Sequence, residues 1–241
     1  MGEGNTSIAV CLAGQQRTLS TVWTNIFDAM VRPLQPDVDL FAVVKLDAHH
    51  SRATSILTQH AVRLVYRKSL DNLIGLTSHT PCYQMIQDHE QTRARLYQWV
   101  LRVRTDIAYG SRMPSHLPKI NGAQRTVWVE FCGPDASNNK PSTCPRTNKD
   151  GTFGCAKDTW ALMTRAASRV YFDAHMLNND KGCKHDRVGK YKSSPECRLG
   201  CALHRSNVTV HTLRIERKIV RQHTTTPMPA INSEIVVPMV S

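Results

Sequence analysis

Hydrophobic positions in the first third of the chain alternate between short apolar runs and helical periods. The apolar runs at 8–12, 40–46 and 62–66 predict buried strands, because continuous aliphatic and aromatic residues suit a strand covered on both faces. Apolar residues at helical spacing predict helices over 19–30 and 51–59. This alternation predicts an α/β fold with an open, mostly parallel sheet and helices on both faces.

The remainder of the chain continues the alternation, with long polar loops between its elements. The expected elements are, in order, a polar helix over 85–99, a strand over 99–106, a strand over 127–129, a helix over 159–174, a helix over 195–204 and a strand over 208–213. Polar loops are expected at 132–155 and 178–194, and prolines mark the segment from 224 onward. We therefore expect one domain over 1–223 and a weakly ordered tail over 224–241.

Composition supports a folded protein with a basic surface. The chain has 241 residues, of which 41% are hydrophobic, enough for a packed core, and no internal repeat is visible. Lys and Arg number 31 against 19 Asp and Glu, a formal net charge of +12. Such a charge favours a polyanionic partner, namely nucleic acid, a phosphate-bearing metabolite or an acidic membrane. A generally basic surface without a specific ligand is the alternative.

The sequence does not indicate a single cellular compartment. There is no apolar run long enough to span a membrane and no visible signal peptide, so the default expectation is the cytoplasm. Eight cysteines fit disulfides in an oxidising compartment or reduced thiols elsewhere. Two glycosylation sequons, Asn5-Thr6-Ser7 and Asn207-Val208-Thr209, occur by chance often enough to decide nothing.

A cluster of cysteine and histidine in the C-terminal half raises the possibility of zinc. Cys183, His185, Cys197 and Cys201, with His204 nearby, have the necessary donor atoms. Their spacing differs from the usual paired-cysteine zinc pattern, and disulfides or free thiols explain the same residues.

Candidate chemistry gathers at the ends of two predicted strands. After the first strand, Gly14 permits a tight turn and a helix N-terminus follows. Between them, Arg17 can donate two hydrogen bonds to phosphate oxygens. After the strand over 99–106, Asp106 can hold Mg²⁺ or Mn²⁺ through a diphosphate, with Arg102 and Arg104 neutralising the phosphate charge. The alternatives are a plain strand–helix turn and an ordinary Arg–Asp surface pair.

Four ordered segments resemble a poorly characterised group of GT-A-type glycosyltransferase-like proteins. The segments are IAVCLAGQQRT at 8–18, YQWVLRVRTD at 97–106, CAKDTWALMTR at 155–165 with VYF at 170–172, and SPE at 194–196 with the residues up to 203. They resemble the group's hhhSGQxRT, RxRPD, DxFAhhxR and PExxLxxHL patterns. Ala13 stands where the group has serine, and Thr105 replaces its usual proline, which predicts a less rigid loop after the fourth strand.

The resemblance implies transfer of a sugar from a nucleoside-diphosphate sugar to the hydroxyl of a glycan or protein acceptor. It implies a diphosphate-binding set at the ends of the first and fourth strands, comprising Gly14, Gln15, Arg17, Arg102 and Arg104. Asp106 would lie beside the β-phosphate or its Mn²⁺ or Mg²⁺ ion, although the full DxD metal motif is absent.

Two carboxylates are candidates for the base that deprotonates the acceptor, Asp158 and Glu196. Asp158 is equally explained as a helix or turn cap, and Glu196 as an acidic residue favoured at a helix N-terminus. His204 and His211 are further candidate metal ligands.

Two other functions are open. A basic module that binds nucleic acid or another polyanion without catalysis rests on the net charge, and no known RNA-binding signature accompanies it. A catalytically degenerate fold that binds a sugar nucleotide without turning it over is the third reading.

Overall fold

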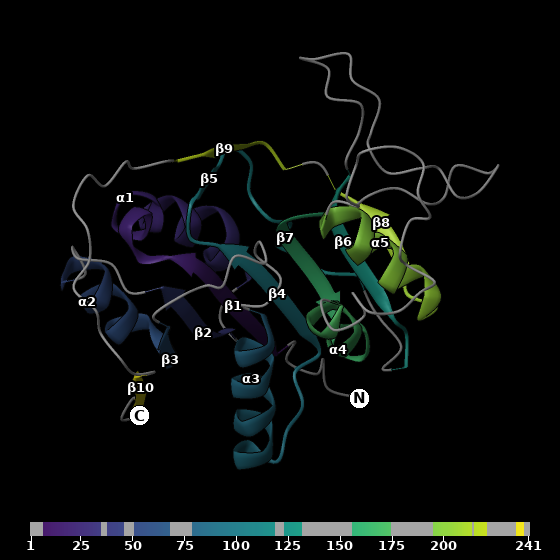
Figure 1. Ribbon diagram of the computed structural model, residues 1–241, viewed down its shortest axis with the longest axis horizontal. Coiled ribbons are helices and arrows are strands. Elements are labelled where there is room, and N and C mark those ends of the chain that lie inside the picture. Colours follow the sequence, from purple (N-terminus) through teal and green to yellow (C-terminus); the bar gives the residue numbers. More distant parts are fainter. Residues whose placement is uncertain are drawn as a thin grey trace.

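The structure of the protein is a computed structural model that describes residues 7–34, 38–45, 51–67, 79–118, 123–131, 156–174, 195–213, 215–220 and 235–238. These ranges form an α/β fold in which helices cover a central sheet (Figure 1). Within them, no helix has the length and apolar character needed to cross a lipid bilayer.

The central sheet is mixed and mostly parallel, as the sequence predicts. Its strands are β1 (Ile8–Gln15), β2 (Val38–Lys45), β3 (Ala61–Arg67), β4 (Trp99–Arg104), β6 (Thr126–Phe131), β7 (Ala156–Thr164), β8 (Thr209–Thr212) and β10 (Ile235–Pro238). They lie in the order β10-β3-β2-β1-β4-β7-β6-β8. Strands β3, β2, β1 and β4 are parallel, β7 is antiparallel to both β4 and β6, and β8 is parallel to β6. The carboxyl ends of β1 to β4, β6 and β8 therefore share one edge, called the carboxyl edge below.

Helices cover both faces of this sheet. They are α1 (Gln16–Ile26), α2 (Ser51–His60), α3 (His79–Arg93), α4 (Arg165–Asp173) and α5 (Pro195–Arg205). A π-helical turn (Phe27–Val31) and a short 3-10 helix (Arg32–Leu34) continue α1. Side chains of α1 and α2 pack into one hydrophobic core, and those of α3, α4 and α5 pack into a second.

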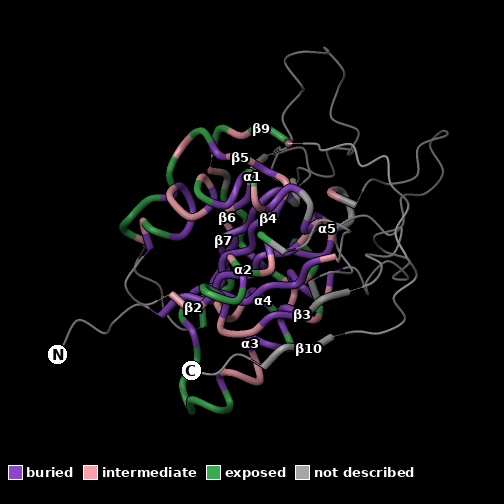
Figure 2. The backbone as a smooth tube through the Cα atoms, turned by 90° about the vertical axis from the view of Figure 1, so that its left-hand side faces the viewer, coloured by how far each residue is buried: buried purple, intermediate pink, exposed green. Residues whose placement is uncertain are grey.

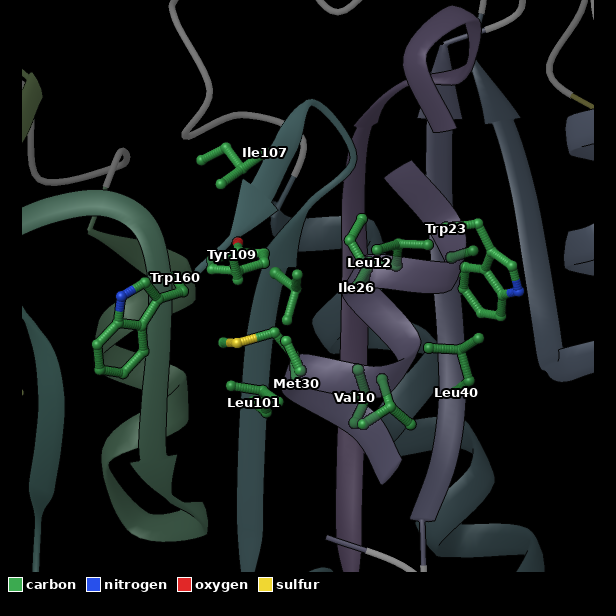
Figure 3. Close-up of a cluster of buried hydrophobic side chains, with 14 of the residues drawn as sticks. Val10, Leu12, Trp23, Ile26, Met30, Leu40, Leu101, Ile107, Tyr109 and Trp160 are labelled. Atoms are coloured by element: carbon green, nitrogen blue, oxygen red, sulfur yellow. The ribbon is translucent and has the colours of Figure 1, made fainter. Parts of the chain in front are cut away.

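Strand β1 lies at the centre of both cores because its side chains alternate between the two faces. Val10 and Leu12 enter the first core, whereas Ala9, Cys11 and Ala13 enter the second. In Figure 3, Val10 and Leu12 lie with Ile26 of α1 and Leu101 of β4 in the first core. Figure 2 shows the resulting concentration of buried backbone in the centre of the molecule. Burial on both faces explains why the run at 8–12 is continuously apolar.

A two-stranded sheet lies against the carboxyl edge. Strand β5 (Ile107–Tyr109) follows β4 directly and pairs antiparallel with β9 (Arg217–Ile219). Figure 1 shows both strands above α1 and the end of β4. Neither strand was predicted, because each is only three residues long.

Strand β7 corrects the helix predicted over 159–174. Residues Trp160 to Met163 are all buried between β4 and β6, and the helix begins only at Arg165. A short continuous apolar run fits a buried strand and a buried helix equally well by periodicity. Asp158 consequently lies in a strand, and its interpretation as a helix cap is wrong.

Two further boundaries differ from prediction. Helix α3 covers residues 79–93 rather than 85–99, since the chain leaves the helix at Ala94, which has a positive φ of 51°. Residues Ile235–Pro238, placed by prediction in a weakly ordered tail, form β10 and pair with β3. The polar loops expected at 132–155 and 178–194 lie outside the described residues.

A disulfide joins Cys11 of β1 to Cys82 of α3, and both side chains are fully buried. Cys201 of α5 is also disulfide-bonded. The free-thiol alternative is thus wrong for these three residues. Cys201 cannot serve as a thiolate ligand for zinc, and Cys183 and His185 lie outside the described residues.

Candidate functional site

The carboxyl ends of β1 and β4 lie side by side at the point where the strand order reverses. The chain passes from β1 to β2 and β3 on one side, then crosses to β4 on the other. Ala13 of β1 pairs with Arg104 of β4, and Gln15 pairs with Lys45 of β2. Ligands of open α/β sheets bind outside the carboxyl ends of the strands at such a switch point. The two predicted clusters of site residues are therefore neighbours.

Gly14 is required by the close approach of the loop that follows β4. A Cβ atom on Gly14 would lie 2.3 Å from Oγ1 of Thr105. In addition, the backbone of Gly14 has a φ of +148°, which residues with a side chain rarely adopt. The glycine therefore lets the two loops meet without a side chain between them.

Thr105 binds the β4 loop to the β1 loop by three hydrogen bonds. Its Oγ1 donates to the carbonyl of Gln15 at 2.8 Å, and its N–H donates to the carbonyl of Ala13 at 3.3 Å. Its own carbonyl accepts from Oγ1 of Thr18 at 3.0 Å. Threonine donates two hydrogen bonds here that proline cannot donate, and these hold the loop that was predicted to be less rigid.

Arg104 and Asp106 form a bidentate ion pair just beyond Thr105. The guanidinium Nε donates to Oδ1 at 2.8 Å and Nη2 donates to Oδ2 at 2.7 Å. Burial raises the pKa of the Asp106 carboxyl, but the hydrogen bonds and charge of Arg104, with the charge of Arg102, outweigh it and hold that pKa below its ordinary value. The carboxylate is ionised near neutral pH and fixes the plane of the guanidinium.

Arg102 places a second positive charge under this pair. It lies in the middle of β4, 1% exposed, with Cys11 and Ala161 as its strand neighbours. The charge of its guanidinium is one of the causes that lower the pKa of Asp106, so Arg102 adds to the positive potential at the end of β4.

The N-terminus of α1 adds partial positive charge at the same edge. Helix α1 starts at Gln16, directly after β1. The side chain of its N-cap residue, Gln15, makes no capping hydrogen bond to the helix. Arg17 occupies the first turn of the helix, and its side chain is outside the described part of the molecule. Gln16 Nε2 donates to Thr54 Oγ1 of α2 at 2.8 Å, which fixes the start of α1.

The two candidate bases approach this edge from different elements. Asp158 lies near the start of β7, and since β7 is antiparallel to β4, its backbone lies beside the end of β4. Glu196 is half-buried in the first turn of α5, which ends beside the start of β8 and so begins toward the carboxyl edge. The side chain of Asp158 is not described, and no contact of Glu196 with Arg104 or Asp106 is observed within the described residues.

An additional polar cluster at this edge was missed by sequence reasoning. Glu130 at the end of β6 accepts a hydrogen bond from Thr159 Oγ1 at 3.0 Å and forms an ion pair with Arg217 of β9. The carbonyl of Thr159 in turn accepts from the buried hydroxyl of Tyr109 at 3.1 Å. A glutamate ending the VWVE strand was the available signal, but its partner Arg217 is 87 residues away.

The donor set at Asp106 offers little to a resident Mn²⁺ or Mg²⁺ ion. Both of its oxygens accept from Arg104, which neutralises the carboxylate and leaves only their remaining lone pairs for a cation. Across the described ranges, no group of three His, Cys, Asp or Glu side chains is placed to hold a metal. His211 stacks on Trp128 with ring centroids 5.0 Å apart, and His204 lies in the last turn of α5.

Comparison with known proteins adds no relative. Neither models of known protein families nor the curated proteins give a match to this chain.

Proposed function

We propose that the chain is a glycosyltransferase that moves a sugar from a nucleoside-diphosphate sugar to an acceptor hydroxyl. The observation that carries the proposal is the junction of the β1 and β4 loops at the switch point, where Gly14, Gln15, Arg104 and Asp106 lie together. The strand order supports the finer assignment to a GT-A-like sheet, because the RxRTD segment lies directly beside the AGQQRT segment.

The charges at this edge support a diphosphate ligand. Arg104 presents a planar set of N–H donors held in orientation by Asp106, and Arg102 lies beneath it. The N-terminus of α1 follows β1 directly and lies at the same edge of the sheet. Guanidinium groups and helix N-termini are the groups that proteins most often use to bind phosphate oxygens.

The proposed reaction needs a leaving diphosphate and a base. The acceptor oxygen forms a bond to the anomeric carbon, and the bond from that carbon to the diphosphate oxygen breaks. The diphosphate leaves with the electron pair, and the hydroxyl proton passes to a carboxylate. Arg104 and the α1 N-terminus stabilise the charge that develops on the leaving group.

Asp158 and Glu196 remain the proposed bases, one at the start of β7 and the other at the start of α5. Each belongs to an element that begins toward the carboxyl edge, which supports an acceptor site beyond β4. A role for Mn²⁺ or Mg²⁺ stays a prediction, and the proposed charge stabilisation does not depend on it.

Calorimetric titration with UDP and GDP, each with and without Mn²⁺, tests the donor site. We expect the wild-type chain to bind one of them, and Arg104→Gln to weaken binding about tenfold or more through loss of charged hydrogen bonds. Arg169→Gln is the matched control, since Arg169 forms an exposed ion pair with Asp173 on α4. Absence of binding by either nucleotide under all four conditions would contradict the proposal.

Turnover separates a transferase from a degenerate binding fold. A panel of nucleoside-diphosphate sugars is incubated with glycan and protein acceptors, and release of free nucleotide is measured. Asp158→Asn and Glu196→Gln should bind nucleotide normally, and the one that carries the base should lose turnover. If nucleic acid binds instead, with a steep salt dependence that Arg104→Gln leaves unchanged, the basic-module alternative is correct.

A further inference from the structure

The turn between α5 and β8 exposes an asparagine in a left-handed conformation. Asn207 has a φ of 53°, and its N–H donates to the carbonyl of His204 at 3.0 Å. The N–H of Val208 donates to the carbonyl of Leu203, also at 3.0 Å. This pair of hydrogen bonds is a Schellman motif, in which the left-handed residue is usually glycine and sometimes asparagine. The motif explains a small or amide residue at 207 but makes no demand on residue 209.

Asn207 also begins an Asn-Val-Thr sequon whose reactive groups face solvent. Asn207 and Thr209 are exposed, whereas Val208 between them is buried and anchors the turn. Within the described residues, neither the Asn207 amide nor the Thr209 hydroxyl makes a hydrogen bond to another group. An Asn-X-Thr sequence at an exposed turn is the acceptor pattern for N-linked glycosylation.

The cysteines independently indicate the compartment in which that modification takes place. Cys11 and Cys82 are joined although they lie 71 residues apart, and Cys201, six residues before Asn207, is also disulfide-bonded. Stable structural disulfides form in oxidising compartments and are rare in the reducing cytosol. The disulfides therefore argue against the expectation that the protein is cytoplasmic. They favour an oxidising compartment, in which the Asn207 sequon can be glycosylated.

The position of Asn207 leaves room for a large substituent. The N–H of Thr209 donates to the carbonyl of Arg125 just before β6, so the turn lies at the edge of the sheet opposite the carboxyl edge. A glycan there projects away from Arg104 and Asp106.

We propose that Asn207 is a site of N-linked glycosylation. The amide Nδ2 forms a bond to the anomeric carbon of a lipid-linked diphosphate oligosaccharide. The bond from that carbon to the diphosphate oxygen breaks, the lipid diphosphate leaves with the electron pair, and one amide proton passes to a base of the host transferase. This modification is independent of the transferase activity proposed for the chain itself.

Mass spectrometry of the full chain purified from its own cells tests the site. Trypsin releases residues 206–214, and treatment with an amidase that removes N-linked glycans in heavy-oxygen water converts a glycosylated Asn207 to labelled Asp. We expect the labelled peptide and a faster-migrating protein after treatment. An unmodified Asn207 peptide, or label at Asn5 alone, overturns the proposal.

Three full-length variants expressed in the same cells separate the glycan from the helix cap. Asn207→Gly keeps the left-handed turn and removes the acceptor amide, so the mobility shift should disappear while folding is retained. Thr209→Ala should abolish the shift, and Thr209→Ser should preserve it. A shift that persists in Asn207→Gly places the modification elsewhere and contradicts the assignment.

Discussion

Gly14, near the end of β1, and Thr105, directly after β4, are 91 residues apart in sequence, yet a single Cβ atom on Gly14 would overlap the Thr105 hydroxyl at 2.3 Å. The hydroxyl uses that space to donate to the carbonyl of Gln15. This contact fixes the distance between the α1 N-terminus and the Arg104–Asp106 pair, so the geometry of the proposed diphosphate site depends on it.

Gly14→Ala should destabilise the fold by about 2–4 kcal/mol, from a strained φ and from overlap with a packed neighbour. The midpoint and slope of urea unfolding measure the loss. The double variant Gly14→Ala/Thr105→Ala removes the overlapping hydroxyl and should recover part of it, which makes the two effects non-additive. If the destabilising effects of the two substitutions simply add, the contact between residue 14 and the Thr105 hydroxyl does not cause the loss of stability.

Thr105→Pro introduces the residue that the resembling proteins carry at this position. It should cost about 2–3 kcal/mol, since the hydrogen bonds to Ala13 and Gln15 are both lost. Thr105→Ser retains both donors and should stay within about 1 kcal/mol of wild type. Thermal unfolding of the three proteins provides the comparison, and equal stability of the proline variant would contradict the hydrogen-bonding account.

Reduction of the Cys11–Cys82 disulfide should destabilise the protein markedly. The bond closes a loop of 71 residues, for which chain entropy predicts roughly 4 kcal/mol. Cys82→Ala should reproduce the loss and should make unfolding insensitive to reductant at this site. Unfolding curves with and without reductant, compared for both proteins, measure the effect, and the residual sensitivity reports the disulfide at Cys201.

A second network lies at the opposite edge, and its proton positions follow from its partners. The hydroxyl of Tyr97 contacts Asp39 Oδ2 and His89 Nδ1, each at 2.7 Å. The Tyr97 hydroxyl donates its one proton to Asp39, so His89 Nδ1 donates to the Tyr97 oxygen. Burial and the Asp39 carboxylate raise the pKa of the Tyr97 hydroxyl, which stays protonated.

The His89 network should make stability fall in mild acid. Burial lowers the pKa of His89 below 6.5, with Arg93 and Arg63 acting in the same direction and Asp39 and Glu90 opposing. The native state therefore binds fewer protons than the unfolded chain, so its stability is complete above pH 6.5 and is lost as pH falls through the lowered pKa. His89→Gln should flatten this dependence between about pH 7 and 5 in urea titrations, whereas His116→Gln at an exposed position should not.

The Glu130–Arg217 ion pair should hold β9 against the carboxyl edge. Glu130→Gln removes the charge while keeping the shape, and a cost of about 1–2 kcal/mol is expected because both groups are largely buried. Amide exchange at Val220, which donates to the carbonyl of Asp106 at 2.8 Å, should accelerate more than exchange in β1. Glu216→Gln, at the exposed neighbouring position, is the control. Uniform acceleration across the fold would indicate general destabilisation instead.

The elements that could be predicted are those whose pattern reflects local burial. The runs that became β1, β2 and β3 are apolar because both faces of each strand are covered, and Pro195 with Glu196 marked the start of α5. Gly14 and Asp106 were identifiable because a glycine and a carboxylate directly after buried strands are informative by themselves.

The remaining features depend on partners far away in sequence. Whether Trp160 belongs to a helix or a strand is decided by β4 and β6 on either side of it. Thr105 is held by its hydrogen bond to Gln15, and Glu130 is linked to β9 by its ion pair with Arg217. Periodicity within a window of the sequence contains no information about such contacts.

The pairing of β10 with β3 also has a consequence for synthesis on the ribosome. Tyr66 and its partner Ile235 are separated by most of the chain, so the outer edge of β3 stays open while the intervening residues are translated. An open strand edge is a template for pairing between nascent chains. Production at high concentration should therefore favour aggregation before β10 emerges, and holding chaperones that bind extended segments should raise the yield of folded protein.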